Sequence, residues 1–169
     1  DTFTYSLVPD AADNALFEVV GNQLRTSTVF DFETRNSFTV RVVSKDAGGL
    51  TVDQPFKITV IDGNEAPAIT SAATASVAEN STAVMTVTGS DPDSGAVLRY
   101  TITGGADEKL FKVDQDTGAL AFLFPPNYEA PASSSNDNTY RVVVTVSDGV
   151  LTANKPITIT VTDVNEAPT

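Results

Sequence analysis

The chain has 169 residues, of which 41% are hydrophobic, and it carries a formal net charge of −12 at pH 7. This hydrophobic content is enough for packed cores and argues against global disorder, while the acidic charge argues against nucleic acid or anionic membrane surfaces as partners. The sequence contains no cysteine and no histidine, which excludes thiol nucleophiles, thiolate zinc sites and serine–histidine catalysis.

The first half of the chain contains four predicted strands, at residues 3–7, 15–19, 38–42 and 56–60. In the third of them, apolar residues alternate with Thr39 and Arg41. A period of two over such a length predicts a half-buried β-strand. Because no segment shows the apolar spacing of a helix, the sequence predicts an all-β protein.

An acidic string, Asp62-Gly63-Asn64-Glu65-Ala66-Pro67, follows the fourth strand. The string returns near the C-terminus as Asp163-Val164-Asn165-Glu166-Ala167-Pro168. Two copies of one acidic tail behind one kind of strand indicate an internal repeat. Carboxylate and amide oxygens at the end of a strand suit a hard cation, although they also suit an ordinary turn.

The second half of the chain repeats the four strands in the same order, at residues 98–102, 109–113, 140–146 and 157–161. Short strands with turn signals at this spacing predict antiparallel sandwiches of the immunoglobulin-like, Greek-key type. We therefore expect two tandem sandwiches, over residues 1–66 and 67–169. Tyr5 and Tyr100 fall at matched positions, and we expect both to lie in the cores.

The two copies differ in what precedes this matched tyrosine. Residues 68–99 separate the linker proline from Tyr100, whereas only residues 1–4 precede Tyr5. We therefore expect the first copy to be N-terminally truncated, lacking its first strands, with bare sheet edges and an incomplete core. A strand from a neighbouring molecule could complete it, so self-association is one expectation.

Further acidic residues surround the predicted junction between the copies: Asp31 and Glu33, then Asp91 and Asp93, and finally Asp148. Two carboxylates about 4 Å apart repel each other by up to roughly 4 kcal/mol at an effective dielectric constant near 20. A cation between them would remove this repulsion. Ligand sets made only of oxygen favour calcium over softer metals.

These segments resemble the cadherin repeat, in its short bacterial cadherin-like form, and the resemblance covers essentially the whole chain. Ala78-Glu79-Asn80 is similar to the family's Pro-Glu-Asn segment, and Asp31-Phe32-Glu33 to its Asp-Arg-Glu segment. Asp62–Pro67 is similar to the family's calcium-binding linker, shortened by one residue. Asp91-Pro92-Asp93 resembles its Asp-Ala-Asp segment, and Ser147-Asp148-Gly149 its late Ala-x-Asp segment.

The resemblance implies two calcium sites. The junction site would be formed by Asp31, Glu33, Asn64, Glu65, Asp91, Asp93 and Asp148. A weaker C-terminal half-site would combine Glu79 with Glu129, Asn165 and Glu166, and Asn127 stands there where the family has aspartate. The first copy has no counterpart of Glu79, which puts full occupancy of the junction in doubt.

The resemblance also implies a function, which is that of a calcium-binding extracellular adhesion module without enzymatic activity. Calcium ions between neighbouring repeats would stiffen a rod-like surface or secreted protein, which we expect to be bacterial. The expected partners are calcium, neighbouring repeats, a second copy of the chain, or a protein or glycan ligand on a cell surface. A catalytic role for Asp31 and Glu33 is disfavoured because no nucleophile or second catalytic group accompanies them.

Two alternatives remain at this stage. A carbohydrate-binding module of a polysaccharide-active protein would need an exposed aromatic platform, and the chain has no tryptophan and only four tyrosines. An accessory domain of a secreted enzyme would be distinguished only by the sequences that flank it.

Overall fold

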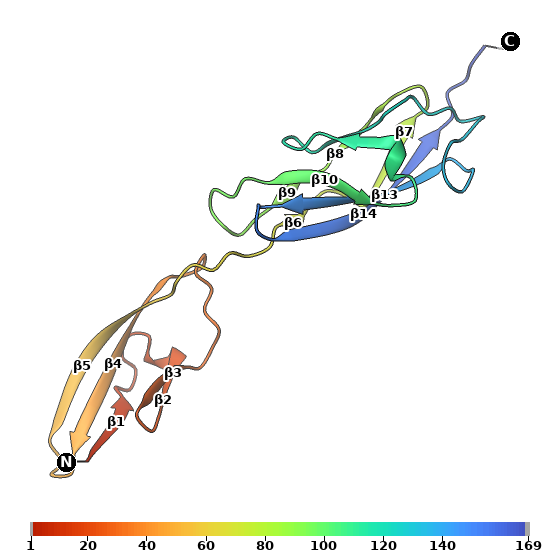
Figure 1. Ribbon diagram of the computed structural model, residues 1–169. Coiled ribbons are helices and arrows are strands. Elements are labelled where there is room, and N and C mark those ends of the chain that lie inside the picture. Colours follow the sequence, from red (N-terminus) through yellow and green to blue (C-terminus); the bar gives the residue numbers. More distant parts are fainter. Residues whose placement is uncertain (1, 168–169) are drawn as a thin grey trace. The chain divides into compact units, whose positions relative to one another are not determined.

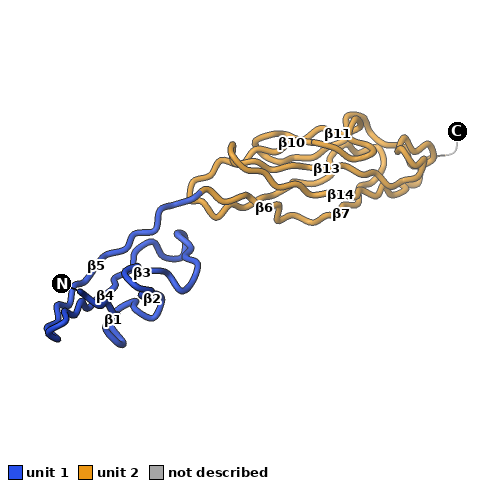
Figure 2. The backbone as a smooth tube through the Cα atoms, turned by 60° about the horizontal axis from the view of Figure 1, so that its bottom comes forward, with its two compact units in different colours: residues 1–63 blue, residues 64–169 orange. Residues whose placement is uncertain are grey.

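A computed structural model describes residues 2–167. The chain divides into two compact units, Asp1–Gly63 and Asn64–Thr169 (Figure 2). Apart from two short 3-10 helices, every regular element in the described residues is a β-strand. The all-β prediction is therefore confirmed. Pro168, which ends the second acidic string, lies outside the described residues.

Unit 1 contains five strands and one 3-10 helix: β1 (Phe3–Leu7), η1 (Asn14–Leu16), β2 (Phe17–Val20), β3 (Gln23–Thr26), β4 (Ser37–Asp46) and β5 (Thr51–Thr59). They form an antiparallel sheet in the order β1-β4-β5 and a separate β2-β3 hairpin (Figure 1). The predicted strand at residues 15–19 is partly wrong, because its first two residues belong to η1.

The core of unit 1 is small and aromatic. Phe17, Phe38 and Val40 are its buried apolar residues. The rings of Phe30 and Phe38 are stacked with centroids 4.2 Å apart, and Phe17 meets the ring of Phe30 at 5.4 Å. Such aromatic pairs add packing energy beyond the area that they bury.

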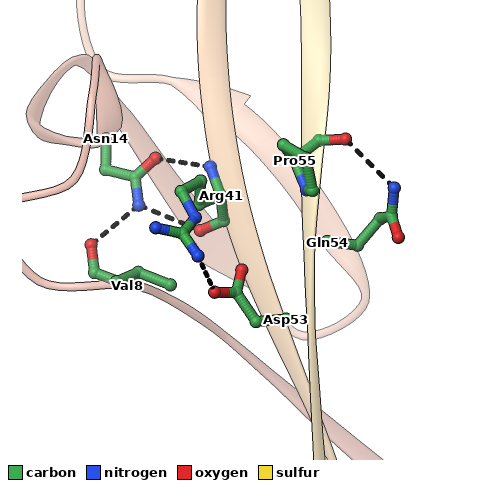
Figure 3. Close-up of polar contacts among 6 residues, drawn as sticks. All are labelled: Val8, Asn14, Arg41, Asp53, Gln54 and Pro55. Atoms are coloured by element: carbon green, nitrogen blue, oxygen red, sulfur yellow. Dashed lines mark hydrogen bonds and ion pairs between the residues drawn. The ribbon is translucent and has the colours of Figure 1, made fainter.

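A buried asparagine in η1 ties this short helix to Val8 and to strand β4 (Figure 3). The Asn14 side chain is 5% exposed. Its amide nitrogen donates to the carbonyl oxygens of Val8, at 2.7 Å, and Arg41, at 2.9 Å, while its oxygen accepts the Arg41 N–H at 2.8 Å. The guanidinium of Arg41 in turn forms an ion pair with Asp53 of β5. The buried polar group is thus satisfied, as burial requires.

Unit 2 contains nine strands and one 3-10 helix: β6 (Ala68–Ile69), β7 (Thr74–Ala78), β8 (Ala83–Thr86), β9 (Gly89–Ser90), β10 (Arg99–Gly104), η2 (Glu108–Leu110), β11 (Phe111–Val113), β12 (Ala119–Phe122), β13 (Thr139–Ser147) and β14 (Thr152–Thr162). One sheet, whose strands are labelled in Figure 1, has the order β10-β13-β14-β7. The facing sheet has the order β11-β12-β8. Strand β7 runs parallel to β14, whereas the other ladders are antiparallel.

The core of unit 2 is filled from both sheets, as a sandwich requires. Alternate residues of β13 and β14 are buried, with Val144 and Ile159 both 0% exposed. Leu120 of the facing sheet is 2% exposed. The alternation read from the sequence therefore corresponds to one buried face on each of these strands.

The strands of the two units correspond in register. Phe38 pairs with Ile58 in unit 1, and Tyr140 pairs with Ile159 at the same place in unit 2. Strands β1 to β5 thus correspond to β10 to β14, while β6 to β9 have no counterpart among the described residues of unit 1. Tyr100 is 7% exposed but Tyr5 is 40% exposed, so the prediction that Tyr5 is a core residue is wrong.

Candidate metal sites

Three carboxylates of unit 2 lie close together, two of them directly after β9 and the third directly after β13. Asp91, Asp93 and Asp148 are all half-buried, and each offers a carboxylate oxygen within 4.8 Å of the others. One oxygen of Asp91, Oδ2, is buried and has no hydrogen-bond partner among the described residues. Buried carboxylate oxygens are normally paired, so this cluster has the donor chemistry of a hard-cation site.

Local turns hold these carboxylates in place. The N–H of Asp93 donates to Oδ1 of Asp91 at 2.9 Å, which folds the Asp91-Pro92-Asp93 segment back on itself. Oδ1 of Asp148 accepts the N–H groups of Val150 at 2.6 Å and Leu151 at 2.7 Å. The two segments are therefore shaped by their own side chains.

The first residues of unit 2 are bound to this cluster. The Asn64 amide nitrogen donates to Oδ2 of Asp148 at 2.8 Å, and the N–H of Glu65 donates to Oδ2 of Asp93 at 3.0 Å. The pKa of Asp148 lies below its ordinary value because the Val150 N–H, the Asn64 amide and the Leu151 N–H stabilise its charged form. Rotation of the Asn64 amide would present its oxygen in place of its nitrogen.

Unit 1 carries an acidic group of its own at Asp31, Glu33 and Asp62. Asp31 accepts the N–H groups of Glu33, at 3.0 Å, and Thr34, at 3.2 Å, and the Thr34 hydroxyl at 2.8 Å. The Thr34 hydroxyl and then its N–H lower the pKa of Asp31.

The pKa of the neighbouring Glu33 is shifted in the opposite direction. A hydrogen bond from its own backbone lowers its pKa, but desolvation and the carboxylates of Asp31 and Asp62 outweigh this effect, and the pKa is raised. The carboxylates of Asp31 and Asp62 thus disfavour the charged form of Glu33, a repulsion that a cation would relieve.

A second acidic group lies where the last strand of unit 2 ends. Glu79 is 3% exposed, and its carboxylate accepts the N–H groups of Tyr128 at 2.8 Å and Val164 at 2.9 Å. These two bonds lower the pKa of Glu79. Carboxylate oxygens of Glu79, Glu129 and Asp163 lie within 4.8 Å of one another.

The other residues predicted for the C-terminal half-site are placed differently. Glu166 accepts the side-chain amide of Asn80 at 2.8 Å. Asn165 is exposed. The Asn127 side chain accepts the N–H of Ala130 at 2.8 Å and so closes its own turn. Among the predicted residues, the structure groups Glu79 with Glu129 only.

Sequence reasoning did not assign ligand roles to Asp62 and Asp163. The structure puts Asp62 close enough to Glu33 to raise the Glu33 pKa, and it puts Asp163 beside Glu79 and Glu129. Both aspartates are the first residue of the repeated acidic string. Their identical position in the two copies is the signal that could have identified them.

Comparison with known proteins adds an independent line of evidence. The family model described as "Cadherin domain" matches residues 73–162. Mouse cadherin-23 is 29% identical over 168 residues, which cover 89% of this chain and 5% of that protein. Cadherin-87A of Drosophila melanogaster is 26% identical over 94% of this chain and 8% of that protein. The chain thus spans only a small part of the curated relatives that it matches.

Solved structures agree at the level of the fold. The crystal structure of human protocadherin-24 EC1-2 has a TM-score of 0.70 at 19% identity, over 98% of this chain and 84% of that one. The crystal structure of mouse cadherin-23 EC22-24 has a TM-score of 0.65 at 23% identity, over 96% of this chain and 53% of that one.

Proposed function

Because the chain belongs to the cadherin domain family, we propose that it is a calcium-binding adhesion module of an extracellular protein. Its role would be mechanical, since ions held between consecutive domains fix the orientation of one domain to the next. The donor chemistry of the two units supports this proposal.

The observation that carries the proposal is the unpaired, buried Oδ2 atom of Asp91 within a cluster of three carboxylates. A buried acceptor without a donor is unfavourable by about 1–3 kcal/mol, and by more when it is charged. Repulsion from Asp93 and Asp148 adds to this energy. Calcium supplies positive charge to such a site and accepts six to eight oxygen ligands.

We assign the proposed ligands to two sets, one in each unit. The set of unit 2 consists of Asn64, Glu65, Asp91, Asp93 and Asp148. The set of unit 1 consists of Asp31 and Glu33, to which the structure adds Asp62. Gly63 and Asn64 are consecutive residues, so ions that take ligands from both sets would stiffen the connection.

The C-terminal acidic group would be the weaker site. Glu79, Glu129 and Asp163 supply its carboxylates, and Asn165 and Glu166 complete the proposed set. The two N–H groups that bind Glu79 already compensate much of its charge, so we expect this group to bind calcium less strongly than the Asp91 cluster.

The experiment is a melting curve of the chain in EDTA and in calcium, repeated for Asp93→Ala and for the control Glu18→Ala, which alters an exposed residue of β2. At tenfold excess over Kd, each independent ion adds about 1.4 kcal/mol of stability, which corresponds to a rise in Tm of several degrees. The Asp93→Ala variant should lose most of this rise, and the control should keep it. An unchanged Tm in the unmutated chain would refute the proposal.

The setting of the module is inferred from its family. No helix in residues 2–167 is long and apolar enough to cross a membrane. We place the domains outside the cell, on a surface or secreted protein that presents them as a row of repeats. A bacterial source stays a prediction, since the relatives named above are animal proteins.

A further inference from the structure

The linker string contains the pair Asp62-Gly63, in which an aspartate is followed directly by a glycine. The amide nitrogen of the residue that follows an aspartate can attack the aspartate side chain. Glycine hinders this attack least, because it has no Cβ and its backbone adopts many conformations. The chain contains one other such pair, Asp148-Gly149, and the second copy of the string has Asp163-Val164 in the place of Asp62-Gly63.

Asp62 and Gly63 lie between two points at which the fold holds the linker. Before them, the N–H of Val60 donates to the carbonyl oxygen of Asn36 at 3.0 Å. After them, the side chain of Asn64 is bound to the acidic cluster of unit 2. Both residues are exposed and outside the strands, and within residues 2–167 no hydrogen bond holds the Asp62 carboxylate or the Gly63 N–H. The two groups can therefore rotate toward each other.

The pair Asp148-Gly149 is held at both of its reacting groups. Oδ1 of Asp148 accepts the N–H of Val150 at 2.6 Å, and Oδ2 accepts the side-chain amide of Asn64 at 2.8 Å. The N–H of Gly149, which would be the attacking group, donates to Oγ of Ser147 at 3.0 Å. Attack on the side chain would break these hydrogen bonds, so the fold protects this pair.

The pair Asp163-Val164 is protected in a different way. The N–H of Val164 donates to Oε1 of the buried Glu79 at 2.9 Å. The β-branched side chain of Val164 is also stiff and crowds its own amide nitrogen. The two copies of the acidic string thus differ at the residue that would carry out the attack.

We propose that Asp62-Gly63 is a site of spontaneous isoaspartate formation in the folded protein. First, the amide nitrogen of Gly63 forms a bond to Cγ of Asp62, and the carboxyl hydroxyl leaves as water with the N–H proton. Water then opens the resulting succinimide ring. Addition of water at the α-carbonyl leaves the chain connected through Cγ, as isoaspartate, whereas addition at Cγ restores aspartate. Water is the only co-reactant, and the mass of the chain is unchanged.

The product alters the connection between the two units. In isoaspartate the main chain runs through Cβ and Cγ, so it is longer by one atom, and the free carboxylate is attached to Cα. Because Asn64 is held by unit 2 and Val60 by unit 1, the extra atom changes the spacing between these two attachments. The linker of an old molecule therefore differs from that of a newly made one.

The two Asp-Gly pairs provide an internal comparison. Their sequence alone would make them equally reactive, and the hydrogen bonds of Asp148 and Gly149 make them unequal while the chain is folded. Unfolding removes these bonds. A comparison of the folded with the unfolded chain therefore separates the effect of the fold from the effect of the sequence.

The experiment is an incubation of the chain for several weeks at neutral pH in EDTA, either folded in buffer or unfolded in guanidinium chloride. The chain is then digested with an endoprotease that cleaves before aspartate but not before isoaspartate, and the peptides are identified by mass spectrometry. In the folded chain, cleavage before Asp62 should be lost several-fold faster than cleavage before Asp148. In guanidinium chloride, the two rates should be similar.

Two variants of the pair and one control complete the experiment, with enzymatic methylation of isoaspartate as a second readout. Gly63→Val copies the second string and should slow isoaspartate formation several-fold. Asp62→Glu keeps the charge but requires a larger ring, which forms more slowly, so methylation at this position should be lost. Gly48→Ala, at an exposed glycine where a Cβ would meet no atom closer than 3.4 Å, should leave the reaction unchanged. Circular dichroism checks the fold of each variant.

Three results would overturn the proposal. Cleavage before Asp62 that stays complete in the folded chain but is lost in guanidinium chloride would mean that the fold protects this pair too. Equal losses at Asp62 and Asp148 in the folded chain would mean that the hydrogen bonds of Asp148 give no protection. A loss that Gly63→Val leaves unchanged would mean that the Gly63 nitrogen is not the attacking group. Since EDTA removes calcium throughout, the proposed function is tested separately.

Discussion

The side-chain amide of Asn64 donates to Oδ2 of Asp148 across 2.8 Å, although the two residues are 84 positions apart in the chain. The hydrogen bond makes the first residue of unit 2 part of that unit's acidic cluster. The linker string Asp62–Pro67 is therefore not an unattached connection. Its second half is held by the sandwich that follows it.

Replacement of Asp148 by asparagine should weaken calcium binding by about tenfold or more, since the charge of the ligand set tunes calcium affinity. Isothermal titration calorimetry measures the effect. The control is Asp114→Asn, which removes the same charge from a turn where the carboxylate accepts the N–H groups of Asp116 and Thr117. Equal calcium affinities in the two variants would show that Asp148 is not a ligand.

Alanine substitutions at the matched residues Leu24 and Leu120 test whether the core of unit 1 is incomplete. Leu120→Ala should destabilise unit 2 by about 2–5 kcal/mol, because it empties a buried site. Leu24→Ala, at the corresponding position of unit 1, should destabilise by less than about 1 kcal/mol, because its side chain is already partly solvated. Urea unfolding followed by NMR signals of each unit measures both. A similar loss in the two variants would argue that Leu24 is covered in solution.

Alanine substitutions at Gly118 and Gly95 would separate the effect of backbone strain on stability from the effect of a steric clash. Both have positive φ, +71° and +86°, a region in which other residues are strained by about 1–2 kcal/mol. A Cβ at Gly118 would also lie 2.1 Å from the carbonyl oxygen of Val87, whereas at Gly95 it would meet nothing within 4 Å. Gly118→Ala should therefore lower Tm much more than Gly95→Ala. Equal shifts in calorimetry would contradict the close approach to Val87.

The pH dependence of the stability of unit 1 should reflect the ionisation of the Asp13 carboxyl group. Its carboxylate binds the Arg35 guanidinium through two bonds of 2.7 and 2.8 Å and accepts the Thr39 N–H at 2.7 Å. The Arg35 bond and then the Thr39 bond lower the pKa of Asp13 in the folded state. Its contribution is thus fully present above the unfolded pKa, near 3.9, and is lost as the pH falls through the folded pKa.

Chemical unfolding from pH 7 to pH 2.5 measures this contribution. Asp13→Asn should be less stable than the unmutated chain by a constant amount at pH 5–7, and the difference should shrink below about pH 4. Arg35→Gln serves as the second variant, and it should likewise reduce the loss of stability that the unmutated chain shows below about pH 4. A difference that persists unchanged to pH 2.5 would exclude Asp13 as its source.

The long strands could be predicted because each buries one face over many residues. In β13 the alternation of buried and less buried residues is unbroken from Tyr140 to Val146, and each even-numbered residue in this range is buried. Strand β3 was not predicted, since Leu24 is its one apolar residue. Strand β7 was not predicted either, because the residues of β14 with which it pairs, from Thr158 to Thr162, lie far away in the sequence.

Part of the candidate site could be predicted because some of its residues lie in local motifs that the sequence shows directly. Asp91, Asp93 and Asp148 lie in short turn motifs that the sequence displays, and the structure brings their carboxylates together. Glu166 looks equivalent to Glu65 in the repeat, yet its carboxylate is bound by Asn80. Such a competing hydrogen bond depends on three-dimensional neighbours, which a single sequence does not reveal.

The parallel pairing of β7 with β14 has a consequence for a domain that is pulled from its two ends. These strands lie near opposite ends of unit 2 in sequence, and tension on the chain would slide them past each other. Their hydrogen bonds, from Thr74–Thr158 to Ala78–Thr162, would then bear the load together and not break one after another.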